Sequence, residues 1–192
     1  MTVLDRELEQ IAALINDLPR QSQAAVFWAA SSAHLGSLGR WIEEHGAMCT
    51  VLRQPQEAAY SFCMGRLPVD RASALLDELG RSLPENVVAQ GSWICADAAL
   101  RIVVDATFEP GMSIEYALEP VLGRTCAELF GFWQVGSGDA EDEEVAEIMA
   151  QPDVVSAIEF CRWAVRRLAM AGAPSAAVLE GIRARAAVLT DG

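Results

Sequence analysis

Apolar residues recur every three or four positions along most of the chain, which is the spacing of helices with one buried side. The pattern first predicts a helix over Val3–Asp17, where leucines and isoleucines alternate with acidic residues. A second helix is expected to begin at Pro19, and it contains Ala24–Ala30, a run that is apolar on every side. Because such a run has no face suited to water, it predicts a buried element at the centre of the fold.

Prolines, glycines and capping residues divide the rest of the chain into further segments of helical periodicity. Pro55 and Pro68 are expected to open helices over Gln56–Met64 and Val69–Leu79, and a further helix is expected over Trp93–Phe108. The next is expected from Ser113 to about Gln134, with a kink or an interrupted first turn at Pro120. We expect the last three in the acidic stretch before Pro152, over Val154–Met170 and over about Ser175–Leu189. No segment alternates polar and apolar residues for long enough to predict a strand. The pattern therefore predicts an all-α fold, a compact bundle of about eight helices, in a single domain over residues 1–192.

The charge of the chain narrows the choice of partners. The 192 residues contain 27 acidic and 14 basic side chains, for a formal net charge of −13, and every basic residue is Arg. Residues 91–192 alone carry a net charge of −9. Such a field repels nucleic acids and phosphate-rich membrane surfaces and attracts basic proteins. We therefore expect no nucleic acid and no membrane as partners, and a basic protein as the partner.

Six carboxylates fall within the nine residues Asp139–Glu147, with no basic residue among them. Phe130-Gly-Phe-Trp133 lies shortly before this stretch, and an aromatic anchor beside a charged cluster is typical of a protein-binding surface. The candidate partner-binding residues are Phe132, Trp133, Asp139, Glu141, Asp142, Glu143, Glu144 and Glu147. The alternative is a solvated charged face, next to a helix end that simply packs on the bundle.

Few residues carry the patterns of catalytic chemistry. There is no Gly-rich phosphate loop, no Gly-x-Ser-x-Gly elbow and no paired Cys and His, so we assign no catalytic residues and expect no cofactor. A metal-binding alternative uses Asp97, Asp105 and Glu128, which fall on helices expected to be largely buried. The simpler account pairs Asp97 and Asp105 with Arg101 at a spacing of four residues.

Only two histidines occur, His34 and His45, eleven positions apart. Glu43 and Glu44 adjoin His45, so a surface metal site there is a second alternative. The simpler interpretation makes His34 a helix-end residue and places His45 near the C-terminus of its helix, where the macrodipole favours a cation.

The five cysteines show no C-x-x-C pair, and most have apolar neighbours. They are therefore expected to be reduced, mostly buried thiols of a cytoplasmic protein. The acidic N-terminus lacks the layout of a targeting peptide, and no apolar run approaches the ~18 residues that a membrane-spanning helix needs.

The order of these signals resembles the YjaG-like family of bacterial proteins, a domain of unknown function. The resemblance rests on the opening pair of helices and on three short segments, Asp97-Ala98-Ala99, Ser113-Ile-Glu115 and Glu147-Ile-Met-Ala-Gln-Pro152. The chain departs from the family at Ser32–Gly36, where an aromatic segment usually closes the second helix. The resemblance implies a compact all-helical domain, with no accepted reaction and no catalytic residues.

The sequence thus favours a non-enzymatic protein-binding module. One version is an immunity protein or antitoxin whose acidic face neutralises a basic, toxin-like partner. The alternatives are a helical metal-dependent enzyme and a ligand-binding or self-associating protein that forms a homo-oligomer.

Overall fold

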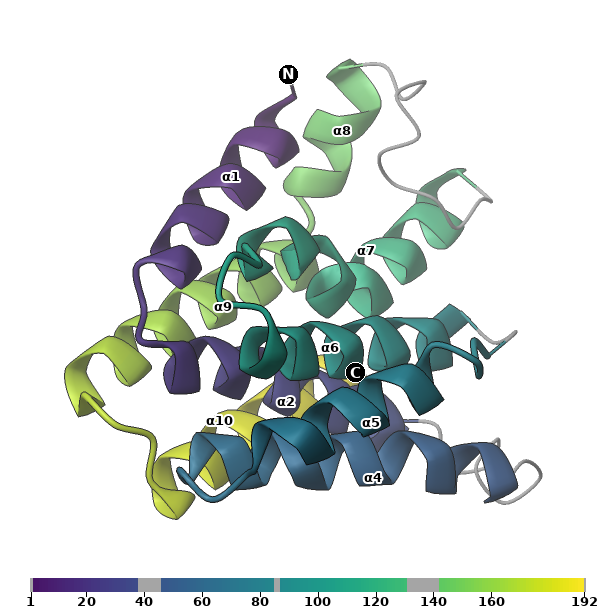
Figure 1. Cartoon of the computed structure of the whole chain (residues 1–192). Helices are drawn as coiled ribbons and strands as arrows, with labels where there is room; N and C mark the ends of the chain where they lie inside the picture. The colour runs from purple at the N-terminus through teal and green to yellow at the C-terminus, as the bar shows by residue number, and fades with distance from the viewer. Residues whose placement is uncertain (1, 38–45, 85–86, 131–141, 192) are drawn as a thin grey trace.

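The computed structural model describes residues 2–37, 46–84, 87–130 and 142–191 (Figure 1). All regular elements within these ranges are helices, which confirms the predicted all-α bundle. In chain order they are α1 (Val3–Asn16), α2 (Arg20–Ser37), α4 (Gly46–Cys63), α5 (Val69–Leu79), α6 (Val87–Val104), the 3-10 helix η1 (Pro110–Ser113), α7 (Ile114–Phe130), α8 (Asp142–Met149), α9 (Pro152–Ala171) and α10 (Ala176–Asp191).

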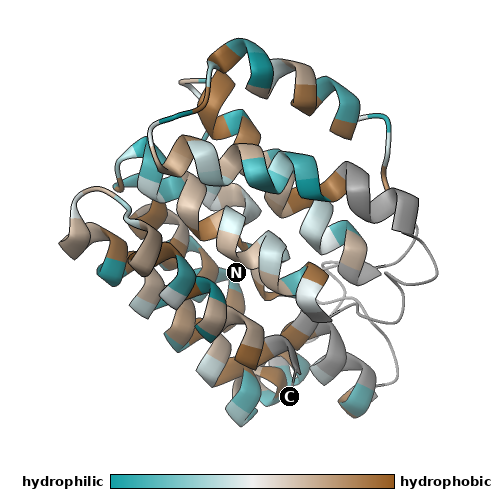
Figure 2. Cartoon of the chain, turned by 90° about the horizontal axis from the view of Figure 1, so that it is seen from below, coloured by the Kyte–Doolittle hydropathy of each residue, from teal (hydrophilic) through white to brown (hydrophobic). Residues whose placement is uncertain are grey.

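Helix α2 lies at the centre of the fold and packs against α6, α10 and α4 (Figure 1). Its segment Ala24–Ala30 is buried throughout, as the sequence predicts. The surrounding helices carry polar and apolar residues in alternation along their length, so each can turn an apolar side toward α2 or toward its neighbours (Figure 2). A smaller apolar cluster lies apart from this main core and includes Leu52 of α4, Leu75 of α5 and Leu100 of α6.

The contact between α2 and α6 depends on small side chains. Both helices bury mainly Ala, Ser and Cys, which lets their backbones approach closely. The Ser31 hydroxyl donates to the Ser92 carbonyl at 2.8 Å, and the Ser92 hydroxyl donates to the Ser31 carbonyl at 2.9 Å. The Gln56 side-chain amide of α4 donates to the Ser31 hydroxyl at 2.9 Å, so the third helix is tied to the same point.

Arg20, the first residue of α2, fastens the far end of α6. Its guanidinium donates to the carbonyl oxygens of Phe108 at 2.8 Å and of Ile102 at 2.9 Å, and also to that of Asp105. The last carbonyls of a helix have no partner within the helix and carry partial negative charge. Arg20 therefore stabilises the C-terminal end of α6 and ties it to the first turn of α2.

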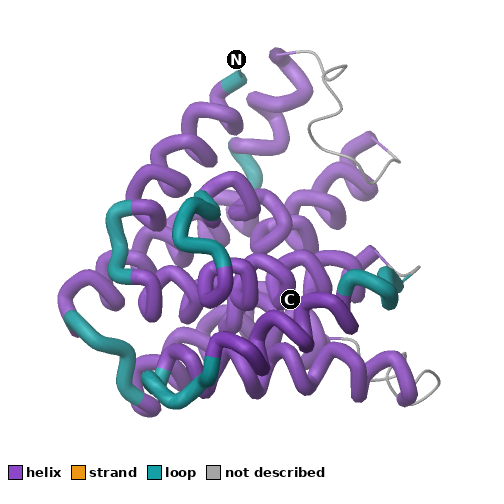
Figure 3. The backbone as a smooth tube through the Cα atoms, in the orientation of Figure 1, coloured by secondary structure: helices purple, strands orange, loops and turns teal. Residues whose placement is uncertain are grey.

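Several predicted boundaries are confirmed. Val69–Leu79 is helical over the predicted range, and Val3–Asp17 differs from α1 by one residue. The β-branched segments 87–89 and 102–104 lie within α6, and the described ranges contain no strand (Figure 3).

Two predicted boundaries are wrong because tertiary packing overrides local signals. Pro55 does not open a helix but lies inside α4, which begins nine residues earlier at Gly46, and Leu52 in the added segment is fully buried. Helix α6 begins at Val87 and not at Trp93, and it continues through Gly91. The helix expected from Ser113 is confirmed at its start, because α7 begins at Ile114 and continues through Pro120, with η1 before it; residues 131–134 of the predicted range lie outside the described residues.

We expect Arg20→Met to lower the free energy of unfolding by about 2 kcal/mol, because charge-assisted hydrogen bonds to the end of α6 are lost. Urea unfolding followed by circular dichroism measures this. Arg71→Met is the matched control, since Arg71 is exposed on α5, and we expect a change within about 0.5 kcal/mol. Equal losses in the two variants would contradict the role assigned to Arg20.

Candidate functional site

The described part of the acidic stretch forms α8. Its apolar residues Val145 and Ile148 are buried and anchor the helix, while Glu143 and Glu147 are exposed and Glu144 is half-buried. The helix contains four acidic residues in eight and no basic residue. Its first turn is a favourable place for carboxylates because the helix macrodipole is positive there, but Glu147 gains nothing from that effect.

Helix α8 packs beside α1, which adds more negative charge (Figure 1). Asp5 and Glu9 of α1 are exposed, whereas Glu7 is half-buried and pairs with Arg162 of α9. We define the acidic surface as the exposed carboxylates of these two helices, Asp5, Glu9, Glu143 and Glu147. On each helix the two carboxylates are four residues apart, so they lie on the same side and repel each other by a few tenths of a kcal/mol.

The predicted aromatic anchor lies outside the described residues. Phe132, Trp133, Asp139 and Glu141 fall in the range 131–141, and the side chain of Asp142 is also outside the description. Their part in binding therefore stays a prediction. His45 and its neighbours Glu43 and Glu44 are outside it as well.

The carboxylates of the metal-binding alternative do not form a cluster. Asp97 is half-buried and pairs with Arg101, with 2.6 Å between Oδ2 and Nε, which confirms one of the two predicted pairs; Asp105 forms no ion pair with Arg101. Asp105 is exposed just after α6 and accepts hydrogen bonds from the Thr107 backbone and hydroxyl, which lower the pKa of its carboxyl. Glu128 is exposed on α7. Among the described residues, no group of three or more His, Cys, Asp or Glu is arranged to hold a metal ion.

His34 lies in the last turn of α2, as expected for a helix-end residue, but its side chain is in the core and only 1% exposed. Its Nε2 lies 3.4 Å from the Ala117 carbonyl of α7, to which it donates a hydrogen bond. Burial lowers the pKa of His34 to about 4, although the bond to Ala117 opposes that shift. The imidazole is therefore neutral at pH 7, with its proton on Nε2.

Glu119 of α7 approaches His34 beside Gly91 of α6. A Cβ atom at Gly91 would lie 2.8 Å from His34 Nδ1 and 3.1 Å from Glu119 Oε2, so both atoms point at the same spot on α6. Glu119 Oε2 is buried and has no hydrogen-bond partner among the described residues. Burial, and then the charge of Glu115, raise the pKa of Glu119. The three helices thus meet around a pair of titratable groups that both favour their neutral forms.

Sequence analysis did not find this arrangement, although a signal was present. His34 follows Ala30 by one turn and Phe27 by two, so it continues the buried side of α2. Had Gly91 been placed inside a helix, it would also have indicated that another element approaches the helix closely at that position. The partner Glu119 could not be inferred, because it lies 85 residues away in sequence and on another helix.

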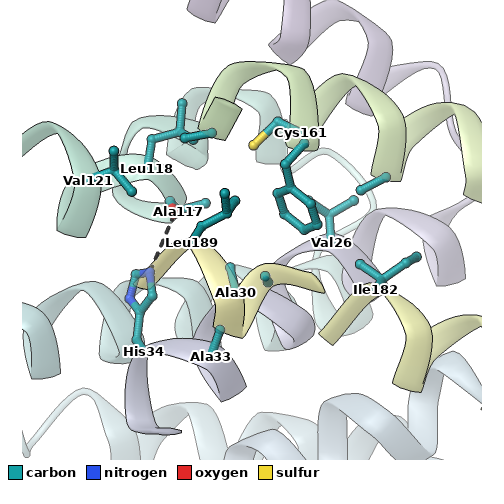
Figure 4. A pocket seen from close by; sticks show the side chains of 14 residues that line it. Val26, Ala30, Ala33, His34, Ala117, Leu118, Val121, Cys161, Ile182 and Leu189 are labelled. Atoms are coloured by element: carbon teal, nitrogen blue, oxygen red, sulfur yellow. Dashed lines mark hydrogen bonds between the residues drawn. The ribbon is translucent and has the colours of Figure 1, made fainter. Parts of the chain in front are cut away.

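A small cavity adjoins His34 between α2, α7, α9 and α10 (Figure 4). His34 lies on one side of it and Cys161 on the other, and most of the remaining lining is apolar (Figure 4). The cavity measures about 30 Å³, which is space for one or two water molecules. Sites for small ligands measure roughly 300–1,000 Å³, so this cavity is a packing gap among alanines and too small for a substrate.

The described thiols are not activated as nucleophiles. Cys63, Cys95 and Cys161 are free and buried, which confirms the prediction for these three. Burial raises the pKa of Cys63 and that of Cys161 to about 12, and burial together with the Glu119 charge raises the pKa of Cys95. Because the thiolate is the reactive form, these side chains are inert at neutral pH.

Comparisons of the chain with protein-family models, with curated proteins and with solved structures find no match. The resemblance to the YjaG-like family therefore stays a prediction. No helix among the described residues is long and apolar enough to cross a membrane.

We expect Gly91→Ala to destabilise the protein by about 1–3 kcal/mol, because the new methyl group would overlap His34 and Glu119. Gly181→Ala is the matched control: it is also a glycine inside a helix, but its Cβ would meet nothing within 4 Å. That variant should gain about 0.5–1 kcal/mol from helix propensity. Thermal unfolding of both measures the difference, and stabilisation by both substitutions would contradict the close approach at Gly91.

We expect the stability of the wild-type protein to fall as the pH is lowered from 6.5 toward 4, because over this window the unfolded chain binds a proton at His34 and the folded chain does not. The loss attributable to His34 is roughly 3 kcal/mol. Glu119, whose pKa is raised, acts in the opposite sense, but it is present in both proteins when wild type is compared with His34→Gln. Urea unfolding at a series of pH values should show a steeper fall for wild type, and parallel curves would contradict the assignment.

Proposed function

We propose that this chain is a non-enzymatic protein-binding module whose acidic surface binds a basic protein. The observation that carries the proposal is the side-by-side placement of α1 and α8, each with exposed carboxylates one helical turn apart. The two carboxylates of each pair repel each other, which lowers stability. A basic partner would be attracted by both carboxylates and would relieve this repulsion.

The rest of the chain supports the same proposal. A net charge of −13 raises the association rate with a positively charged partner. The buried His34 and the buried thiols favour their neutral forms, so none of these side chains is a charged nucleophile at neutral pH. One specific form of the proposal is an immunity protein or antitoxin that covers the cationic cleft of a toxin-like partner, with Phe132 and Trp133 as the anchor.

The partner can be identified by comparing two charge-reversed variants in affinity capture from the native cell. Glu143→Arg with Glu147→Arg reverses two carboxylates of the acidic surface. Asp70→Arg with Asp77→Arg makes the same change in net charge on α5, where both side chains are exposed. We expect a basic protein that is captured by wild type and by the α5 variant but lost with the α8 variant.

The captured protein then provides a quantitative test. Each interfacial charge pair that is lost should weaken binding by roughly 1–2 kcal/mol, and affinity should fall steeply as salt is raised from low to molar concentration. Binding that responds neither to salt nor to the α8 substitutions would refute the proposal. An equal loss in both variants would show that net charge alone, and not this surface, attracts the partner.

A further inference from the structure

A second feature, far from the acidic surface in sequence, is a groove between α4 and α10. Both helices pack against α2, but in the described part of the chain they make little contact with each other. The space left between them is an open groove of about 440 Å³. This volume lies within the roughly 300–1,000 Å³ that is typical of small-ligand sites.

Aromatic rings from two helices form the floor of the groove. Trp28 of α2 and Tyr60 of α4 lie with their ring centroids 5.2 Å apart, and Trp28 is almost wholly buried. The Arg183 guanidinium of α10 lies over the Trp28 ring, 5.8 Å from its centroid, and pairs with Glu180. These contacts hold one wall of the groove in a defined position before any ligand binds.

The other wall carries two charges that are still available. Arg53 and Glu57 are one turn apart on α4, the spacing at which opposite charges commonly pair. Neither takes part in an ion pair within the described residues, and both line the groove. The groove therefore offers a ligand one guanidinium, one carboxylate and an aromatic lining.

The balance of charge selects among ligand classes. The four charged side chains of the groove are two arginines and two glutamates, so it is neutral in a chain of net charge −13. An anion would meet the repulsion of the glutamates and of the whole chain, whereas a cation, although attracted by the net charge, would meet the Arg53 guanidinium and leave it unpaired. A molecule with both charges avoids either penalty and satisfies both free groups.

We propose that this groove binds a small zwitterion with an aromatic group, that is, an aromatic amino acid. Its carboxylate pairs with Arg53, its ammonium group pairs with Glu57, and its ring packs against Tyr60. The site is independent of the acidic surface, because it is built from α2, α4 and α10 and not from α1 or α8.

Three probes that share one ring test the charge requirement. Titration calorimetry and amide chemical shifts of the full chain are measured with L-phenylalanine, with phenylacetate, which lacks the ammonium group, and with phenethylamine, which lacks the carboxylate. We expect saturable binding of phenylalanine with shifts at α4 and α10, and binding of each singly charged probe at least about tenfold weaker, since one charge-assisted pair is lost.

Substitutions assign each charge to its partner. Arg53→Gln should weaken phenylalanine binding about tenfold without weakening phenethylamine binding, because the cation loses only a guanidinium that repels it. Glu57→Gln should likewise weaken phenylalanine binding without weakening phenylacetate binding. Arg71→Gln, which alters an exposed Arg of α5 outside the groove, should have no effect. The substituted side chains are exposed, so thermal unfolding should confirm that all three variants are folded.

Three results would overturn the proposal: no saturable binding of phenylalanine, equal affinity for the three probes, or phenylalanine affinity unaffected by both α4 substitutions. None of these results bears on the acidic surface. Conversely, failure to capture a basic partner leaves the groove measurements unchanged, so the two proposals can fail separately.

Discussion

The close approach of α2 and α6 is the constraint on which the rest of the structure depends. Small side chains line both helices, the Ser31 and Ser92 hydroxyls exchange hydrogen bonds with each other's carbonyls, and Arg20 holds the end of α6. With this pair fixed, α4, α7 and α10 take the remaining sides of α2. The gaps left by that arrangement are the small cavity beside His34 and the larger groove between α4 and α10.

The described titratable side chains of the interior favour their uncharged forms, whereas charged side chains lie on the surface. Burial favours the uncharged forms of His34, Glu119 and the described thiols, while the carboxylates of α1 and α8 remain exposed to solvent. A buried charge without a well-placed partner costs several kcal/mol, which is why burial shifts these groups toward their neutral forms. The exposed carboxylates add little to stability, apart from Asp5, whose side chain accepts a hydrogen bond from the Thr2 backbone in the capping box of α1. This separation is why both functional proposals place binding on the surface.

Hydrophobic periodicity was sufficient to predict the class of fold, because it reports directly which side of a helix is buried. The range of α5 and the buried run in α2 followed from it. The sequence failed where a local signal conflicted with a distant contact. Pro55 and Gly91 are usual helix breakers, yet both lie within helices, and at Gly91 the reason is that His34 and Glu119 leave no space for a side chain.

The Arg20 contacts and the groove were also beyond prediction, since they join residues that are far apart in the chain and follow no periodic rule. Part of the predicted site, including Trp133, lies outside the described residues and stays a prediction.

The Arg20–Phe108 hydrogen bond joins positions 88 residues apart, so the start of α2 must wait during synthesis for a partner that is made much later. On the ribosome, α2 emerges before α4, α6 and α10, the three helices that cover most of its apolar side chains. The helix with which it makes its most extensive contact, α6, begins only about fifty residues after α2 ends, and α10, which also packs against it, is made later still. We therefore expect nascent chains that stop short of α6 to expose the most apolar surface and to depend most on chaperones. Synthesis of α6 and then of α10 would cover the apolar sides of α2.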